Sequence, residues 1–403
     1  MANIIAYILL FLSAGGLVTS TIFTGMTLFA TAKYLRARSR RRQQGFDYTP
    51  AASILKPLHG APAYLEECLE GYFKLDYPAY EILFCARRED DAGLAIARKL
   101  SARYPQIPVT ILHSGEPPWI NARCYSMHLM AEAAHYELLV ASDADVPAGR
   151  EYLREMVAPF KDEKIGASTC VYRGHPIDGG FGEQLESLGM SVEMTSGVLV
   201  ADLLEGVQFT LGPSVAIRKA SLDKIGGFAR LGVYAADDYM LGYLIAEAGD
   251  TVVLSDHVID HLILKSGFAK SIEHQLSWMR STRFSRPKGH FGTVLTFAVP
   301  FGILALIAGI LLHHTALGVA LLLFTLVTKM IQSVAVGGLV VHSARAVWLS
   351  FLYPLRDLLG FFLWIASYGS NKLHWHGRIF ELEPGGMIHL PGSPPARATK
   401  AQR

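Results

Sequence analysis

The chain has 403 residues, and its 37 lysines and arginines nearly balance 35 aspartates and glutamates, so the formal charge of +2 gives no support to a nucleic-acid-binding protein. Charged residues make up 18% and apolar residues 51% of the chain, with a mean hydropathy of +0.28. Because a soluble domain has about 25% charged residues, this composition argues against a purely soluble enzyme and indicates membrane-embedded segments.

The N-terminal segment has the charge order of an uncleaved membrane anchor. Residues 1–32 contain no charged side chain, whereas residues 33–42 hold six cations, the reverse of a secretory signal. We therefore predict an anchor over 1–32 and a basic juxtamembrane linker over 33–44. The positive-inside rule places the basic cluster in the cytoplasm, with the N-terminus outside and the following segment inside.

Residues 45–290 have the length and pattern of one large α/β domain. Four apolar runs of strand length alternate with helical stretches near 62–74, 91–104 and 121–135; the runs are Ala52–Leu55, Glu81–Cys85, Val109–Leu112 and Glu137–Ser142. This alternation predicts a mostly parallel sheet with crossover helices. Ligands bind beyond the carboxyl ends of such strands, so the polar residues that follow each strand are the candidates for a site.

The first two strands are followed by polar turns. Lys56-Pro57-Leu58-His59-Gly60 ends the first, where Pro57 stops the strand and Gly60 frees the backbone to line a ligand or to form a plain turn. Glu89-Asp90-Asp91 follows the second, where the acids either accept hydrogen bonds from a nucleoside or cap the next helix.

Two carboxylates follow the fourth strand in Asp143-Ala144-Asp145. Hard oxygen ligands at the edge of a sheet suit Mg²⁺ or Mn²⁺ bridging a diphosphate, because such an ion keeps waters and needs only one or two protein carboxylates. We favour this metal site over a solvated turn.

Further along, Asp237-Asp238 opens an apolar-periodic helix after a glycine-rich stretch. Two adjacent like charges raise the pKa of one carboxyl, which favours a general base, although a helix N-cap explains the pair equally well.

Ahead of the C-terminal apolar region, Arg280, Arg283 and Arg286 recur every third residue after Trp278. This basic face would neutralise a diphosphate or contact anionic lipid headgroups.

Residues 291–370 are predicted to form about three transmembrane or interfacial helices, because 291–328 carries no charged residue and 346–370 is apolar around Arg356-Asp357. Charges at membrane depth usually pair or line a functional interior. The tail 371–403 ends in a low-complexity stretch that we expect to be disordered.

Two further patterns bear on the fold. The four cysteines, which lack any metal spacing, predict reduced thiols in a cytoplasmic domain; they are Cys68, Cys85, Cys124 and Cys170. Leu188, Val192, Leu199 and Leu203 form a helical apolar stripe. It indicates either a helix buried against the sheet or an interfacial helix that faces the acyl chains.

Together these motifs resemble the ceramide glucosyltransferase family, glycosyltransferase family 21, over nearly the whole chain. The resemblance implies a family-2-like GT-A fold in which the turn with Pro57, His59 and Gly60 contacts the donor nucleotide, as does Asp91 with Asp90 beside it. Arg123 stands where the family has a lysine near the nucleotide. Asp143 and Asp145 match the metal-binding motif, and Asp238, with Asp237 beside it, matches the catalytic base.

The closing motif departs from the family pattern of Gln/Arg-x-x-Arg-Trp. Aligned on Trp278, the sequence has Ser277 at the arginine position and His274 at the first position. The diphosphate contact would then need Arg280 or Arg283, and the departure counts against a processive synthase.

The resemblance implies an inverting, metal-dependent hexosyltransferase that moves glucose or N-acetylglucosamine from a UDP-sugar to the hydroxyl of a membrane lipid. A bacterial inner membrane with a cytoplasmic catalytic domain is the expected location. A second acceptor consistent with the resemblance is a hopanoid, bacteriohopanetetrol, with N-acetylglucosamine as the sugar. Three rival functions stay open: a polysaccharide synthase, a polyprenyl-phosphate glycosyltransferase, and a receptor that binds a UDP-sugar without turnover.

Overall fold

A computed structural model describes residues 2–375 and 378–393, which divide into two compact units. The helical unit contains the chain up to Ser39, Arg173–Leu204 and Ile263–His374. The sheet unit contains Arg40–Tyr172, Glu205–Leu262 and the described residues from Trp375 onward. The expectation of disorder in the tail concerns mainly residues 394–403, which lie outside the described residues.

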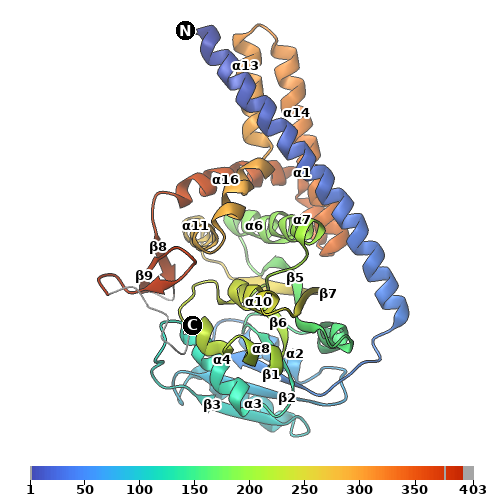
Figure 1. Cartoon of the computed structure of the whole chain (residues 1–403), viewed down its shortest axis with the longest axis vertical. Coiled ribbons are helices and arrows are strands. Elements are labelled where there is room, and N and C mark those ends of the chain that lie inside the picture. Colours follow the sequence, from blue (N-terminus) through green and yellow to red (C-terminus); the bar gives the residue numbers. More distant parts are fainter. Residues whose placement is uncertain (1, 376–377, 394–403) are drawn as a thin grey trace. The chain divides into compact units, whose positions relative to one another are not determined.

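The sheet unit is built on seven strands in the order β3-β2-β1-β4-β6-β5-β7 (Figure 1). Their bounds are β1 Ala52–Pro57, β2 Tyr80–Ala86, β3 Val109–His113, β4 Leu138–Ser142, β5 Ile165–Pro176, β6 Ser214–Arg218 and β7 Thr251–Ile263. The first four strands in this order are parallel, whereas β6 runs antiparallel to both β4 and β5. The predicted mostly parallel α/β domain is confirmed, and the four predicted strands agree with β1 to β4 within two residues at each end.

Helices cover both faces of this sheet. The predicted crossover helices are present as α2 Leu65–Tyr72, α3 Ala92–Arg103 and α4 Ala122–Ala133; the other helices of the unit are α5 Tyr152–Val157, η1 Ala158–Lys161, α8 Lys219–Lys224, α9 Gly227–Leu231 and α10 Asp237–Glu247. Adjacent residues of β1 enter different hydrophobic clusters, Ile54 with Leu94 of α3 and Leu55 with Met127 of α4. Both faces are therefore buried, which explains why these strands read as continuous apolar runs.

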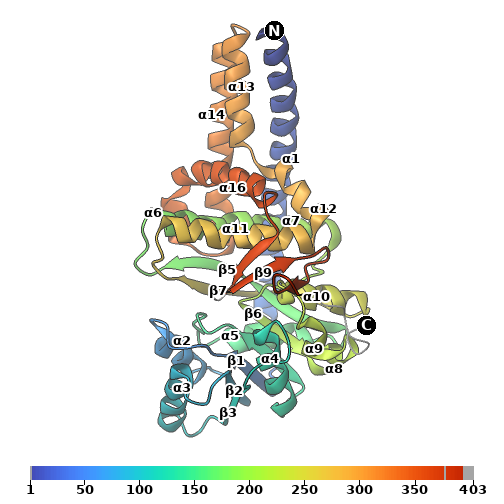
Figure 2. The same cartoon turned by 90° about the vertical axis from the view of Figure 1, so that its left-hand side faces the viewer.

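The helical unit holds most of the long apolar helices (Figures 1 and 2). Its elements are α1 Ala2–Gln44, whose last residues belong to the sheet unit, α6 Phe181–Leu188, η2 Gly189–Met194, α7 Thr195–Glu205, α11 Phe268–Ser285, α12 Pro287–Gly292, η3 Thr293–Thr296, α13 Val299–Leu311, α14 Thr315–Gln332, η4 Ser333–Val340, α15 Ala344–Trp348, η5 Ser350–Leu352 and α16 Tyr353–Ser367, with β8 Lys372–Trp375 at the boundary. In both views α1 runs beside α13 and α14, and Gly16 lets α1 approach the ring of Phe301 closely.

By length and apolar composition, three helical stretches of the described chain can cross a membrane: Ile4–Gln44, Phe181–Glu205 and Thr315–Val340. A fourth is added if Pro287–Thr296 and Val299–Leu311, which are bent by 48°, form one broken span. The predicted anchor near the N-terminus is among them. No helix within 346–370 is among these candidate spans. Phe181–Glu205 is one of them, although its sequence pattern indicates a core or interfacial helix.

The apolar stripe of that segment is packed inside the helical unit. Leu188 and Val192 belong to a hydrophobic cluster with Val336 of η4, Ala346 of α15 and Tyr353 of α16. Leu199 is also buried. Leu188 and Val192 therefore pack against other helices, so for these two side chains the structure contradicts both the interfacial position and burial against the sheet.

The charged residues of the C-terminal apolar region are paired, as expected at membrane depth. Lys329 Nζ lies 2.9 Å from Asp357 Oδ1, and both side chains are almost fully buried. The other oxygen of Asp357 accepts hydrogen bonds from the backbone N–H groups of Ala298 and Val299, both at 2.9 Å. Arg356 Nε lies 3.1 Å from Glu193 Oε2 of η2.

Candidate active site

The candidate site lies in the sheet unit at the carboxyl ends of β1 and β4. β2 and β3 lie beyond one edge of β1, whereas β4 pairs with the opposite edge of β1. Such a reversal of strand order leaves a crevice where α/β sheets bind ligands. Pro57 is the last residue of β1, and Asp143 directly follows β4.

A buried lysine connects these two strands. The Lys56 ammonium donates to the backbone carbonyl of Asp143 and to Ser142 Oγ at 3.4 Å, and it lies 4.0 Å from the centre of the Tyr72 ring. Burial lowers the pKa of Lys56 to about 7, although Asp143 and Asp145 oppose this shift. The sequence pattern put Lys56 in the turn after the first strand without a role of its own, whereas the structure places it inside β1 and fully buried. A lysine directly after an apolar run of strand length was the signal that could have identified it.

Arg123 lies between two of the candidate aspartates, Asp143 and Asp237. It lies in the first turn of α4, which is capped by Asn121 Oδ1 accepting from the backbone N–H of Cys124 at 3.2 Å. Its Nε and Nη2 donate to Asp143 Oδ1 at 3.0 and 2.9 Å, and its Nη1 donates to Asp237 Oδ2. Burial disfavours the charge, but Asp143 and Asp237 together hold the pKa of Arg123 above its usual range.

Asp237 and Asp238 form the first turn of α10, whose N-cap position is Ala236. Neither acid therefore serves as the N-cap, which was the alternative interpretation. Burial, and then the charge of Asp237, raise the pKa of Asp238 to about 6. The backbone of Gly212 lies against the Asp238 carboxylate, because a Cβ at Gly212 would stand 2.9 Å from Asp238 Oδ2.

The first aspartates of the predicted nucleotide site have separate partners. Asp91 caps α3 by accepting from the backbone N–H of Gly93 at 2.8 Å, and it also accepts from Gly60 N–H at 3.1 and 3.0 Å. It therefore caps a helix and fixes the Gly60 turn, where φ is +63°. Asp90 instead forms an exposed ion pair with Arg88. His59 is an exposed residue of the same turn.

The second aspartate of the predicted metal pair is accessible. The Asp145 side chain is 42% exposed, and its Oδ2 lies 3.9 Å from His261 Nε2 of β7. No group of three or more His, Cys, Asp and Glu side chains that could hold a metal ion occurs in residues 2–375 and 378–393. A carboxylate beside an imidazole nonetheless suits a divalent cation whose other positions are filled by phosphate oxygens and waters. Sequence reasoning missed His261, since nothing in its local sequence links it to Asp145.

The predicted closing motif belongs to the helical unit. Trp278 lies on α11, with its ring 4.1 Å from that of His274. Arg280 donates to the carbonyl of Lys372 at 3.0 Å, and Arg283 donates to those of Ser367 and Ser370 at 2.6 and 3.1 Å. These bonds attach α11 to the segment after α16, and a diphosphate contact by either arginine stays a prediction.

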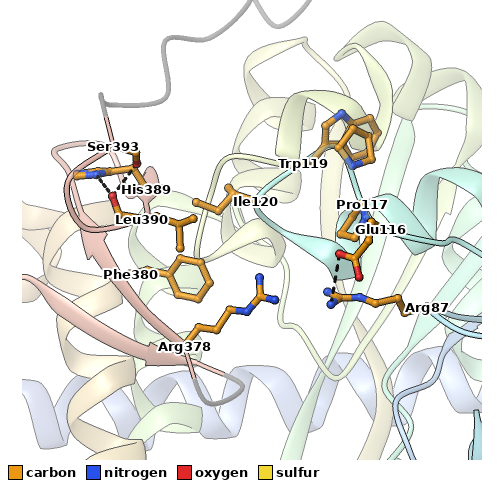
Figure 3. Close-up of a pocket in the computed structure, with 11 residues that line it drawn as sticks. Arg87, Glu116, Pro117, Trp119, Ile120, Arg378, Phe380, His389, Leu390 and Ser393 are labelled. Carbon is orange, nitrogen blue, oxygen red and sulfur yellow. Dashed lines mark hydrogen bonds and ion pairs between the residues drawn. The ribbon is translucent and has the colours of Figure 1, made fainter.

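The sheet unit also contains a pocket of about 320 Å³ (Figure 3). One wall is Arg87, which follows β2, with residues 116–120, which precede α4. The other wall is a C-terminal hairpin of β9 (Arg378–Leu382) and β10 (Ile388–His389), which contributes Arg378, Phe380 and His389. In Figure 3 the side chains of Arg378 and Phe380 point toward Ile120 and Arg87. The hairpin is a part of this surface that the sequence analysis did not anticipate.

A mostly parallel α/β unit with clustered carboxylates at its switch point, in a chain with several potential membrane spans, is typical of a membrane-associated glycosyltransferase. The sequence profile of glycosyl transferase family 21 matches residues 17–388. The chain therefore belongs to this family, and it is a glycosyltransferase.

Curated relatives agree with this assignment. The chain is 28% identical over 208 residues to ceramide glucosyltransferase 1 of Caenorhabditis elegans, covering 52% of this chain and 44% of that protein. It is 24% identical over 370 residues to ceramide glucosyltransferase 3 of the same organism, covering 89% and 78%. The chain thus spans less than half of the first relative and about three quarters of the second.

Solved structures show more distant similarity. A mannosyltransferase from Pyrobaculum calidifontis in complex with GDP-Man and Mn²⁺ is 17% identical, with a TM-score of 0.47 over 85% of this chain and 98% of that one. TarS 1–349 of S. aureus with UDP-GlcNAc is 14% identical, with a TM-score of 0.39 over 86% and 100%.

Proposed function

We propose that this glycosyltransferase moves a hexose, glucose or N-acetylglucosamine, from a UDP-sugar to the hydroxyl of a membrane lipid, with inversion at the anomeric carbon. The observation that carries the proposal is the chain of contacts from Asp143 through Arg123 to Asp237, which ends beside the buried carboxyl of Asp238. This arrangement supports Asp238 as the base beside the crevice that we propose to bind the donor. Family membership and the ceramide glucosyltransferase relatives support a lipid acceptor.

In the proposed reaction Asp238 accepts the proton of the lipid hydroxyl while that oxygen attacks the anomeric carbon. The bond between this carbon and the diphosphate oxygen breaks, and UDP leaves with the electron pair. A single displacement inverts the configuration and needs one base. A carboxyl with a pKa of about 6 suits this role, because it is ionised at neutral pH and more basic than an ordinary aspartate.

Arg123 and Lys56 have supporting parts in this scheme. Arg123 holds Asp143 and Asp237 at fixed positions and lessens their repulsion of the base. Lys56 fixes the backbone at Asp143 through its carbonyl. Preorganised contacts of this kind need not be reorganised as charge develops during the reaction.

A divalent cation, Mg²⁺ or Mn²⁺, fits the donor set of Asp145 and His261, with Asp143 beside them. When bound, such an ion stabilises the negative charge of the departing diphosphate. The turn of Pro57, His59 and Gly60, together with Asp90 and Asp91, would contact the nucleoside. We place the sheet unit on the cytoplasmic side of a membrane, most simply the bacterial inner membrane, because the basic residues after the N-terminal apolar stretch favour that side.

The test is a transfer assay with the purified full-length protein in detergent. UDP-glucose and UDP-N-acetylglucosamine are each offered with ceramide or bacteriohopanetetrol, with and without Mn²⁺, and Asp238→Asn is the control. We expect a glycolipid whose anomeric configuration is opposite to that of the donor. A polymer, or a sugar linked through a phosphodiester to a polyprenyl lipid, would replace this proposal with a synthase or a polyprenyl-phosphate glycosyltransferase.

A further inference from the structure

The C-terminal hairpin is a well-packed part of the sheet unit. Its strands β9 (Arg378–Leu382) and β10 (Ile388–His389) are antiparallel, with Leu382 opposite Ile388 and Glu381 opposite His389. Leu382 and Ile388 are 2% and 0% exposed, so the hairpin has a buried face despite its short length. β9 and β10 belong to a small sheet in the order β10-β9-β8. Such short strands add little stability by themselves, so contacts with the rest of the sheet unit contribute to holding the hairpin in place.

Its backbone is bonded to the segment that precedes the candidate base. The N–H of Ile388 donates to the carbonyl of Val233 at 2.9 Å, and the N–H of Ala235 donates to the carbonyl of Gly386 at 3.0 Å. Between these two bonds, Tyr234 and Met387 form an antiparallel bridge. The hairpin thus adds a short β-ladder to residues 233–235, which immediately precede α10 and its first residues Asp237 and Asp238.

The other side of the same segment is held by Asn121. Its backbone N–H donates to the carbonyl of Gly232 at 3.0 Å, and its side-chain Nδ2 donates to the carbonyl of Tyr234 at 3.0 Å. Asn121 also caps α4, the helix that carries Arg123. Residues 232–235 are therefore clamped between the helix of Arg123 and the hairpin. The loop before Asn121 and the hairpin also form the two walls of the pocket in Figure 3.

We propose that the β9–β10 hairpin is a positioning element of the reaction, in which buried Ile388 keeps residues 233–235 in place and thereby fixes Asp238 against the acceptor hydroxyl. The inference rests on the proposed role of Asp238. A helix that begins only three residues after Tyr234 follows any movement of that residue. Because a displacement of about 1 Å can cost about a hundredfold in rate, a loosened ladder should affect turnover more than donor binding.

The variant that tests this is Ile388→Ala, with Ile379→Ala as its matched control. Both remove the same atoms from the same hairpin, but Ile379 of β9 is 44% exposed whereas Ile388 is fully buried. We expect kcat to fall at least about tenfold in Ile388→Ala, with the dissociation constant for UDP unchanged and Ile379→Ala at the wild-type rate. Unchanged kcat in Ile388→Ala overturns the proposal.

A cross-link separates positioning from general destabilisation. Residues opposed in an antiparallel bridge have Cα atoms about 4.5–5.5 Å apart, which suits a disulfide. Tyr234→Cys and Met387→Cys are therefore added to Ile388→Ala. We expect oxidation to restore kcat and reduction to abolish the rescue. If kcat and UDP affinity fall together in Ile388→Ala, and oxidation restores neither, the hairpin is only structural.

Amide hydrogen exchange gives a readout that does not depend on the reaction. Exchange at residues 235–240 should increase in Ile388→Ala and return to wild-type protection in the oxidised cross-linked variant. Unchanged exchange in Ile388→Ala would show that the hairpin does not hold residues 233–235 in place. A wild-type protein that transfers no hexose to any lipid tested refutes the proposed function, whereas an active wild type with an active Ile388→Ala refutes only the role of the hairpin.

Discussion

Two hydrogen bonds from Arg123 converge on a single oxygen of Asp143, at 3.0 and 2.9 Å, while the remaining arm of the guanidinium donates to Asp237. One cation thereby joins the end of β4 to the start of α10. In the family pattern a lysine occupies this position. A guanidinium, unlike a point-like ammonium, has donors in a fixed fork and can satisfy two carboxylates at once.

The first prediction concerns this bridge. The charge of Arg123 lowers the pKa of Asp238, so Arg123→Ala should raise that pKa further and move the acidic limb of the kcat profile to higher pH. Asp143 and Asp237 would also lose their partner, so the melting temperature should fall. Arg123→Lys keeps the charge and should shift the limb less. A limb that does not move in Arg123→Ala would show that the titrating base is not Asp238.

Asp238→Asn should abolish transfer and leave UDP binding nearly intact, because the amide keeps the shape and loses the base. The activity of the wild type should fall as pH drops through about 6. The raised pKa means that folding favours the protonated carboxyl, so this contribution to stability is present below about pH 4 and is lost as pH rises through 6.

The same variant should therefore be more stable than the wild type at pH 7.5, by at most about 3 kcal/mol from the size of the shift, with no difference below about pH 4. Melting temperatures at both pH values check this. Near-normal turnover in Asp238→Asn would transfer the base role to Asp237 or elsewhere.

The metal prediction tests His261 beside Asp145. Both Asp145→Ala and His261→Ala should weaken Mn²⁺ binding by the protein with UDP present, as measured by electron paramagnetic resonance of free Mn²⁺. His113→Ala, at the exposed end of β3, should bind Mn²⁺ like the wild type. Normal Mn²⁺ affinity in both site variants would contradict the assignment.

The buried pair in the helical unit makes a prediction about stability. Asp357→Asn should leave the Lys329 ammonium buried without a counter-charge and lower the stability by about 3–5 kcal/mol. Adding Lys329→Met removes the uncompensated charge and should recover most of the loss. Thermal unfolding in detergent measures both, with exposed Lys270→Met as the control. A double variant less stable than Asp357→Asn alone would show that the lysine has another essential contact.

The topology can be checked by labelling, but the native cysteines cannot report it. All four are free and buried, so a maleimide would miss them on either side of the membrane. Glu163→Cys places a thiol in an exposed turn of the sheet unit. We expect this thiol to react with a membrane-impermeant maleimide only after the cells are permeabilised. Labelling in intact cells would reverse the orientation.

Much of this protein can be predicted from its sequence alone. The strands β1 to β4 and their crossover helices follow from apolar periodicity, which is a local property of the chain. The anchor near the N-terminus follows from 32 uncharged residues before a basic cluster. Asp143-Ala144-Asp145 was recognisable because it directly follows a strand, and the carboxyl ends of parallel strands share one edge of the sheet.

The contacts between distant segments were decided only by the tertiary structure. Periodicity identified the stripe of Leu188 and Val192 but not its partners, which come from η4, α15 and α16. His261 stands 116 positions after Asp145 and Ile388 stands 155 after Val233, and no local signal marks either pair. Local sequence sets which residues are apolar or charged and at what period. Which of them meet depends on how the chain closes long loops, and the C-terminal hairpin reaches the segment before Asp237 only because the rest of the sheet unit forms a surface that receives it.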